Sequence, residues 1–308
     1  MNKNLLIRMA APVALLLLGF SAALRAQTPA PASGGHFTFT TTATKVTITF
    51  SLSDGARYFP WIDLNKNGSY NKGEALSEAA VALPAAGSYT VYAGDISTLG
   101  CSDNRLTELR LSDCTALNEL DCSNNRLTTL DVSGCVSLSG LNCYNNQLTA
   151  LHVAGCAILT GLDCNNNQLT TLDLSGNSEL EDLSCGTNCL TELDLSRNPL
   201  LYALGCEGNR LTALDVSRNP ELRELYCSRN RLTALDVSRN TLLYALHCAN
   251  NLIGEAAMTR LVLSLPDRTD QEYPGALLLY DRSVAPEGNI LSKENLAKAK
   301  EKNWEPEE

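Results

Sequence analysis

The segment from Asp63 to Glu74 has the residue types and spacing of a calcium-binding loop. Its sequence, DLNKNGSYNKGE, matches the pattern D-x-[DN]-x-[DN]-G-x5-E at every specified position. Calcium prefers oxygen ligands, and the glycine at the sixth position of such a loop allows its sharp turn. The expected ligands are Asp63, Asn65, Asn67, Ser69 (through its carbonyl oxygen), Asn71 (through a water molecule) and Glu74.

The alternative for this segment is a hairpin turn rich in asparagine and glycine that needs no ion. The preceding residues 58–62, YFPWI, favour a strand, whereas an EF-hand loop is flanked by helices. With only two carboxylates, the loop should bind calcium as weakly as extracellular modules do, with a dissociation constant on the order of 10⁻⁴–10⁻³ M. No cofactor is required by the sequence, and calcium is the one ligand that it suggests.

Twelve cysteines form a second group of reactive side chains. Side chains stacked on neighbouring parallel strands lie about 4.8 Å apart, farther than the roughly 3.5–4.5 Å between the Cβ atoms of a disulfide. Cysteines in a regular column should therefore be buried, reduced thiols, whereas Cys189 shares its column with arginine and glutamine and is a candidate for an exposed thiol. The cysteines expected to be buried are Cys101, Cys122, Cys143, Cys164, Cys185, Cys206, Cys227 and Cys248, with Cys114, Cys135 and Cys156.

Enzymatic chemistry has little support in the sequence. The chain has three histidines, and it contains no nucleophile elbow, phosphate-binding loop or HExxH motif. The net charge of −10, from 34 acidic and 24 basic residues, disfavours binding to nucleic acid, which needs a basic stripe. We therefore expect a non-enzymatic protein that does not bind nucleic acid.

Residues 1–26 have the features of a signal peptide. Lys3 and Arg8 precede an apolar run over residues 9–24, which is shorter than the roughly 20 apolar residues of a transmembrane helix. We expect cleavage after Ala26, no transmembrane span afterwards, and a secreted or cell-surface protein.

The elements that must position these residues repeat with a period of 21 residues. The segment LDCSNNRL at 120–127 recurs as LNCYNNQL at 141–148 and LDCNNNQL at 162–169. The pattern LxxLxCxxNxL is the strand segment of a leucine-rich repeat with cysteine at one apolar site. Its asparagines should satisfy backbone groups of neighbouring turns, and they form the column Asn104, Asn125, Asn146, Asn167, Asn188, Asn209, Asn230 and Asn251.

The other half of each repeat, LxxLDVSxN, resembles the first half and predicts a second extended segment instead of a helix. The expected fold is a mainly β leucine-rich-repeat solenoid: a thin, flattened coil with a parallel sheet. An aspartate column on this half, which includes Asp194, Asp215 and Asp236, is expected to form weak ion pairs with Arg197, Arg218 and Arg239.

The cysteine column and the LDVSxN half make residues 98–253 similar to bacterial secreted and surface proteins of the internalin type, in particular those with a cysteine ladder. The ending, residues 254–304, also resembles the closing segment of secreted bacterial repeat proteins. The resemblance implies a role in adhesion and in contact with host or neighbouring cells.

The flanking segments predict an end unit on each side of the repeats. Residues 36–52 alternate and are rich in β-branched side chains, and with residues 89–92 they should form a small β cap. A helix over 255–263, a strand over 276–280 and a helix from Ser292 to about Asn303 predict an α/β cap. The expected organisation is a signal peptide (1–26), a flexible leader (27–35), an N-terminal β cap with the possible calcium loop (36–95), eight repeat strands (96–253) and a C-terminal cap (254–308).

The outer face of the repeat strands is the expected binding surface, because repeat proteins usually bind there with aromatic residues as anchors. We expect an extracellular binding or adhesion protein whose partner is a protein on a cell surface or in the extracellular matrix. The alternative is a glycan-binding module of the cell surface. For any single residue, a merely solvated polar surface remains the simpler reading. The candidate contacts are Tyr144, Tyr226, His247, Asp121, Asp163 and Glu207.

Overall fold

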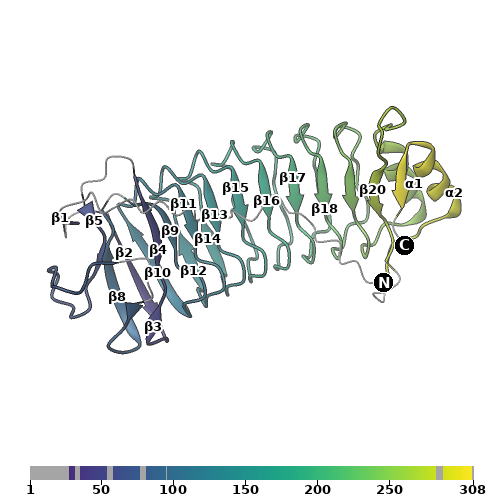
Figure 1. The fold of residues 1–308 in the computed structure, drawn as a ribbon. Helices are drawn as coiled ribbons and strands as arrows, with labels where there is room; N and C mark the ends of the chain where they lie inside the picture. The colour runs from purple at the N-terminus through teal and green to yellow at the C-terminus, as the bar shows by residue number, and fades with distance from the viewer. Residues whose placement is uncertain are drawn as a thin grey trace.

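The computed structural model describes residues 28–31, 35–53, 58–76, 81–94, 96–281 and 287–306. The expected signal peptide lies outside the described residues, as does part of the leader. The described chain is an elongated solenoid with an antiparallel β unit at one end and two helices at the other (Figure 1).

The eight repeat strands lie in one sheet of 11 strands, to which the flanking segments contribute the other three. Equivalent residues of successive repeats lie side by side: Leu120 pairs with Leu99 on one side and with Leu141 on the other, in parallel register. This register confirms the predicted parallel solenoid. The repeat strands are β9 (Ile96–Gly100), β11 (Glu119–Asp121), β13 (Gly140–Asn142), β15 (Gly161–Asp163), β16 (Asp182–Ser184), β17 (Ala203–Gly205), β18 (Glu224–Tyr226) and β19 (Ala245–His247).

Alternation along each strand fills the interior of the solenoid. The central leucine and the cysteine two residues later point inward, so Leu183 and Cys185 are fully buried. Leucines from the rest of the same turn, among them Leu190, Leu195 and Leu201, are also buried. A single turn cannot bury these side chains alone, so the stacking of turns holds the core together.

The opposite side of the coil is extended and contains no helix throughout the fully described repeats, residues 96–253. Its regular strands are β10 (Leu106–Ser112), β12 (Thr129–Asp131) and β14 (Ala150–His152). Strands β12 and β14 pair in parallel, with Leu130 beside Leu151. Later turns follow the same course without regular strand pairing. Because this side carries no helix between residues 96 and 253, the coil stays thin.

The asparagine column forms a hydrogen-bonded ladder inside the solenoid. The Oδ1 atom of Asn188 accepts a bond from the backbone N–H of Leu169 (3.0 Å). Its Nδ2 donates to the carbonyl oxygens of Cys164 (3.0 Å) and Cys185 (3.1 Å). One side chain thus joins two turns, as the sequence predicted.

A second buried column behaves differently. It contains Asn177, Asn198, Asn219 and Asn240. Asn198 donates from Nδ2 to the carbonyl oxygens of Leu174 (3.2 Å) and Asn177 (2.8 Å). The Oδ1 atoms of this column accept no hydrogen bond. These asparagines therefore satisfy carbonyl groups only.

The N-terminal β unit is a four-stranded antiparallel sheet in the order β10-β2-β8-β6. It consists of β2 (His36–Thr41), β6 (Trp61–Ile62), β8 (Gly87–Tyr92) and the shared strand β10. Strand β4 (Thr49–Leu52) pairs antiparallel with β9, the first repeat strand, and forms the end strand of the long sheet. Two small pairs complete the unit: β1 (Thr28–Pro29) with β5 (Tyr58–Phe59), and β3 (Lys45–Val46) with β7 (Val81–Ala82).

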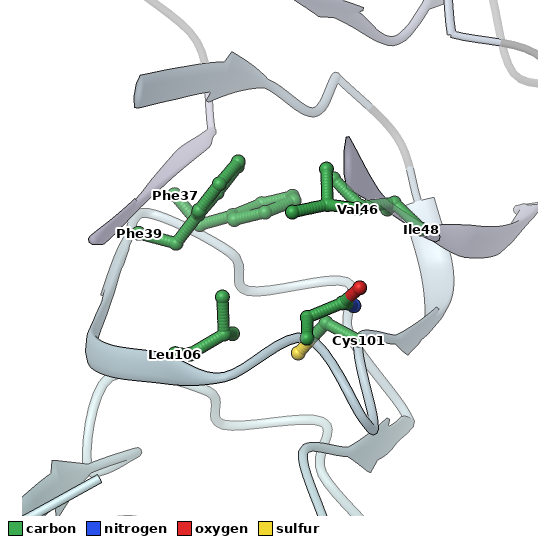
Figure 2. A pocket seen from close by; sticks show the side chains of 7 residues that line it. Phe37, Phe39, Val46, Ile48, Cys101 and Leu106 are labelled. Carbon is green, nitrogen blue, oxygen red and sulfur yellow. The ribbon is translucent and has the colours of Figure 1, made fainter. Parts of the chain in front are cut away.

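Apolar side chains pack the β unit onto the first repeat. Figure 2 shows Phe37, Phe39, Val46 and Ile48 facing Leu106 and Cys101 across a gap. The gap encloses about 180 Å³ of space between the side chains, but none of it is wide enough for a water molecule. We therefore interpret it as a packed junction and not as a ligand site.

At the other end, α1 (Glu255–Ser264), β20 (Gly275–Leu278), α2 (Lys293–Glu301) and β21 (Trp304–Pro306) follow the repeats. Strand β20 continues the parallel sheet, with Leu277 beside Leu246. The hydroxyl group of Ser292 accepts a bond from the backbone N–H of Asn295 (3.2 Å) and caps α2, as expected. In the described part of the chain, no helix is long and apolar enough to cross a membrane.

Candidate functional site

The front face of the solenoid is made by side chains that flank the inward-pointing residues of the long sheet. The last residues of the repeat strands lie side by side in strict register and form what we call the outward row. It consists of Asp121, Asn142, Asp163, Ser184, Gly205, Tyr226 and His247.

Two residues further along each turn, a second row lies on the same side, because side chains alternate. Backbone bonds link successive turns here, for example from the N–H of Asn124 to the carbonyl of Tyr144 (2.9 Å). This second row, which we call the turn row, contains the candidates Tyr144 and Glu207. The outward row contains the other four candidates. The front face thus brings together Asp121, Tyr144, Asp163, Glu207, Tyr226 and His247.

An aromatic cluster lies at the C-terminal end of the front face. The rings of Tyr226 and His247 meet edge to face, with centroids 4.9 Å apart. The hydroxyl group of Tyr226 donates to Oε2 of Glu224 (2.9 Å), and the hydroxyl group of Tyr244 donates to Oε1 of the same carboxylate. Burial and the hydrogen bond with Glu224 raise the pKa of Tyr244 to about 12.

Sequence reasoning missed Tyr244 and its equivalent Tyr202, which come one residue before their strands. Burial, followed by the charge of Asp182, raises the pKa of Tyr202. The two tyrosines are two repeats apart in one column, with Arg223 between them. Their 42-residue spacing, two repeats, could have placed both tyrosines on one face of the solenoid. It was overlooked because the repeat pattern does not specify the residue at which each strand begins.

Partly buried carboxylates occupy the middle of the front face. Burial raises the pKa of Asp182 to about 6, and the charges of Asp163 and Glu224 add to the shift. Burial also raises the pKa values of Asp163 and Glu207. The ion pairs among the described residues are Arg110–Glu108 and Lys298–Glu294, so these three carboxylates are not neutralised by a salt bridge.

The aspartate column on the opposite side does not form the expected ion pairs. The Oδ1 atom of Asp194 accepts a bond from the backbone N–H of Ser196 (2.9 Å), and Asp215 and Asp236 make the same contact with Ser217 and Ser238. These contacts with the serine are also the main reason that the pKa of each carboxyl group is lowered. The charges of Arg197, Arg218 and Arg239 lower the same pKa values by a smaller contribution. The column therefore mainly builds turns, and the arginines interact with it only weakly, without an ion pair among the described residues.

The carboxylates at the two ends of the Asp63–Glu74 loop are both buried. The oxygens of Asp63 accept bonds from the backbone N–H groups of Asn67 (3.0 Å) and Gly68 (2.8 Å). The oxygens of Glu74 accept bonds from the backbone N–H groups of Leu64 (3.1 Å) and Asn71 (2.7 Å). The loop is thus wound around its two carboxylates, and Gly68 has the positive φ of 71° that a glycine tolerates.

The remaining expected ligands lie on the same loop and are more exposed. The amide oxygen of Asn65 accepts a bond from the backbone N–H of Asn67 (3.1 Å), and that of Asn67 accepts one from the backbone N–H of Ser69 (2.8 Å). The carbonyl oxygen of Ser69 accepts a bond from Nδ2 of Asn71 (2.6 Å). The described residues hold no group of three or more histidine, cysteine or acidic side chains that could bind a metal. Any ion in this loop would therefore need amide and carbonyl oxygens in addition to the two carboxylates.

All twelve cysteines are free thiols, and all but Cys189 are buried. Burial raises the pKa of Cys114 and of Cys156 to about 11. For Cys185, burial and then the neighbouring thiols of Cys164 and Cys206 raise the pKa. Because the thiolate is the reactive form, the buried thiols should be inert.

We expect a thiol reagent to label one cysteine rapidly in the native protein and all twelve after denaturation without reductant. Cys189 is the partly exposed thiol, so Cys189→Ser should abolish the rapid phase, whereas Cys185→Ser should leave it unchanged. Fewer than twelve reactive groups in the denatured protein would contradict the reduced ladder.

A groove of about 600 Å³ lies between α1 and the side of the last turns opposite the front face. Its walls include Leu214, Leu235 and Leu263, together with Arg239 and Arg260. It contains none of the six candidate contact residues of the front face, but Asp215, Asp236 and Arg239 of the aspartate column line it.

No family model matches the chain, and no curated protein matches its sequence. The chain is similar to the functional domain of InlJ from Listeria monocytogenes, described as including a cysteine ladder, with 34% identity over 61% of this chain and 45% of that one and a TM-score of 0.46. It is also similar to a leucine-rich-repeat protein of Leptospira interrogans, with 23% identity over 61% of this chain and 54% of that one and a TM-score of 0.49.

An internalin of Listeria monocytogenes, inlF, gives 18% identity over 63% of this chain and 61% of that one, with a TM-score of 0.47. The structural neighbours thus include internalin-type leucine-rich-repeat proteins, and the chain spans 45–61% of the length of these three. The strand register and the 21-residue columns define this chain as a leucine-rich-repeat solenoid, a class of scaffold that presents an extended binding surface.

Proposed function

We propose that this chain is a non-enzymatic extracellular binding or adhesion protein that recognises a protein partner through its front face. The observation that carries the proposal is the placement of the aromatic cluster beside partly buried carboxylates on one continuous sheet face. Interfaces are enriched in tyrosine at their energetic centres, because the rigid ring buries a large area and its hydroxyl group can still find a partner.

Charge narrows the kind of protein partner. Asp163, Asp182 and Glu207 are held partly out of water without a salt bridge, so a basic side chain placed over them would relieve their mutual repulsion. Complementary charge also speeds encounter and aligns the two surfaces. We infer a partner on a host or neighbouring cell whose contact surface is basic.

Export is part of the same proposal. The basic start and the apolar run of residues 9–24 favour a cleaved signal peptide and a secreted or cell-surface location. Internalin-type structural neighbours are in keeping with that location.

A pull-down with the purified mature protein against host and bacterial surface fractions tests the function. Tyr144→Ala and Tyr226→Ala should each weaken binding of the captured protein by about tenfold or more, the typical effect of losing a tyrosine anchor. Their melting temperatures should stay within a few degrees of the unchanged protein, because both side chains are partly exposed and lie outside the core.

Tyr273→Ala is the matched control. This tyrosine is 71% exposed and lies outside the front face, in the C-terminal segment, so binding should not change. Equal loss in all three variants, or none in the first two, contradicts a front-face site. Binding to a glycan array, with no protein captured, favours the glycan-binding alternative.

A further inference from the structure

We propose that the Asp63–Glu74 loop is a calcium site and that the ion locks the outer end of the N-terminal β unit. The site is far along the solenoid from the aromatic cluster: the loop follows β6, which pairs with β8 at one end of the molecule, and the cluster lies on β18 and its neighbour β19 towards the other end (Figure 1). Its test is therefore independent of the partner proposed above.

Two buried carboxylates that form no ion pair with a described residue can bind a cation. Asp63 is 6% exposed and Glu74 is 3% exposed. Burying an ionised carboxylate is costly unless a positive charge compensates it. Neither carboxylate takes part in an ion pair with a described residue. Lys66, a cation within the loop, lies instead with Nζ 5.2 Å from the ring centroid of Tyr89.

The donor set selects the kind of cation. Both oxygens of Asp63 and Oε1 of Glu74 each accept one backbone N–H, so a lone pair remains on these three oxygens. Oε2 of Glu74 accepts two bonds, from the backbone N–H and from Nδ2 of Asn71 (2.7 and 3.1 Å). The exposed amide oxygens of Asn65 and Asn67 lie on the same loop and can complete an all-oxygen set with water. Calcium takes six to eight oxygen ligands in flexible geometry, whereas zinc prefers nitrogen and sulfur and magnesium demands a rigid octahedron.

Hydrogen bonds tie both ends of the loop to the β unit. The N–H of Asp63 donates to the carbonyl of Thr90 in β8 (2.9 Å), and the N–H of Ile62 donates to the carbonyl of Glu74 (2.9 Å). An ion held by Asp63 and Glu74 would close this loop onto β6 and β8. Calcium should therefore stabilise the β unit as a whole.

The neighbouring aromatic rings provide a direct readout. The ring of Tyr70, inside the loop, lies edge-on to Trp61 with centroids 5.9 Å apart. Trp304, the other of the two tryptophans, lies in β21 at the opposite end of the long sheet. Terbium bound in the loop should be excited by Trp61 and Tyr70, and the luminescence should disappear when calcium displaces the terbium.

Titration of the full chain by calorimetry should give one calcium site with a dissociation constant on the order of 10⁻⁴–10⁻³ M. Ten millimolar calcium should raise the melting temperature by roughly 2–5 °C, because the ion binds only the folded loop. Asp63→Asn and Glu74→Gln should weaken calcium and terbium binding by about tenfold or more.

Asn65→Ala keeps the test decisive if the buried substitutions disturb folding, because Asn65 is exposed and its loss should weaken the ion without unfolding the loop. Asp113→Asn is the matched control: it removes an exposed carboxylate outside the loop and should leave binding unchanged. The absence of heat and of terbium luminescence at millimolar ion overturns the site. Equal signals from the native chain, Asp63→Asn and Asn65→Ala would also overturn it.

Discussion

Replacing Asn188 with alanine is expected to lower the free energy of unfolding by roughly 2–4 kcal/mol, a large fraction of the stability of most proteins. The amide of Asn188 accepts from the N–H of Leu169 and donates to the carbonyls of Cys164 and Cys185. All of these groups lie inside the solenoid, where water cannot replace the lost partner. Urea denaturation followed by circular dichroism measures the effect.

Asn198→Ala is the comparison variant, because it removes the same amide from the second buried column. Asn198 donates to two carbonyl groups but accepts nothing, so its loss leaves no backbone N–H without a partner. A carbonyl left without a donor costs less than an orphaned N–H, which is rarer in native proteins. Asn198→Ala should therefore destabilise the protein less than Asn188→Ala. Equal losses would show that the accepted bond is not the important contact.

Asp182→Asn is expected to stabilise the protein at pH 7.5 by roughly 1–2 kcal/mol. About two pH units separate the pKa values of Asp182 in the folded and unfolded states, and the partial access of solvent to this carboxylate reduces the resulting difference in stability. The pKa of Asp182 is about 6 in the folded chain, above its ordinary value of 3.8. The folded state thus binds the proton more tightly than the unfolded state, and stability rises as the pH falls from about 6 towards 4. The advantage of the variant should vanish below about pH 4, where both states of Asp182 are protonated.

Asp194→Asn is the control with the opposite sign. Hydrogen bonds from Ser196 lower the pKa of Asp194, so its carboxylate contributes stability above its unfolded pKa, and this contribution is lost at lower pH. This variant should gain no stability at pH 7.5. Thermal unfolding of the unchanged protein, Asp182→Asn and Asp194→Asn between pH 3.5 and 8 distinguishes a carboxyl group with a raised pKa from one with a lowered pKa. A gain for Asp194→Asn, or no gain for Asp182→Asn, would contradict the assignment.

Much of the fold could be predicted from sequence because the same physical requirement recurs in every repeat. A leucine or cysteine that must be buried against its equivalent marks the inward side of each strand, so one column fixes the register of the whole sheet. The ladder of Asn188 and its equivalents was predictable for the same reason: a polar side chain recurring inside an apolar core must satisfy backbone groups.

The failures concern contacts whose geometry the repeat spacing does not specify. Asp194 and Arg197 recur together, which suggested an ion pair, but the N–H of Ser196 is nearer and needs no ordering of a long side chain. Tyr202 and Tyr244 were missed because they precede their strands by one residue. The front-face candidates could be chosen from sequence because they follow buried positions directly in the alternation.

The parallel register has a consequence for how the number of repeats in such a protein can change during evolution. Every interior strand meets only the strand before it and the strand after it, and the contacts are the same at each step. A whole 21-residue block can therefore be gained or lost by recombination between like blocks, while the two end units keep their own contacts. Selection could thus adjust the reach of the molecule in discrete increments and alter what it recognises block by block.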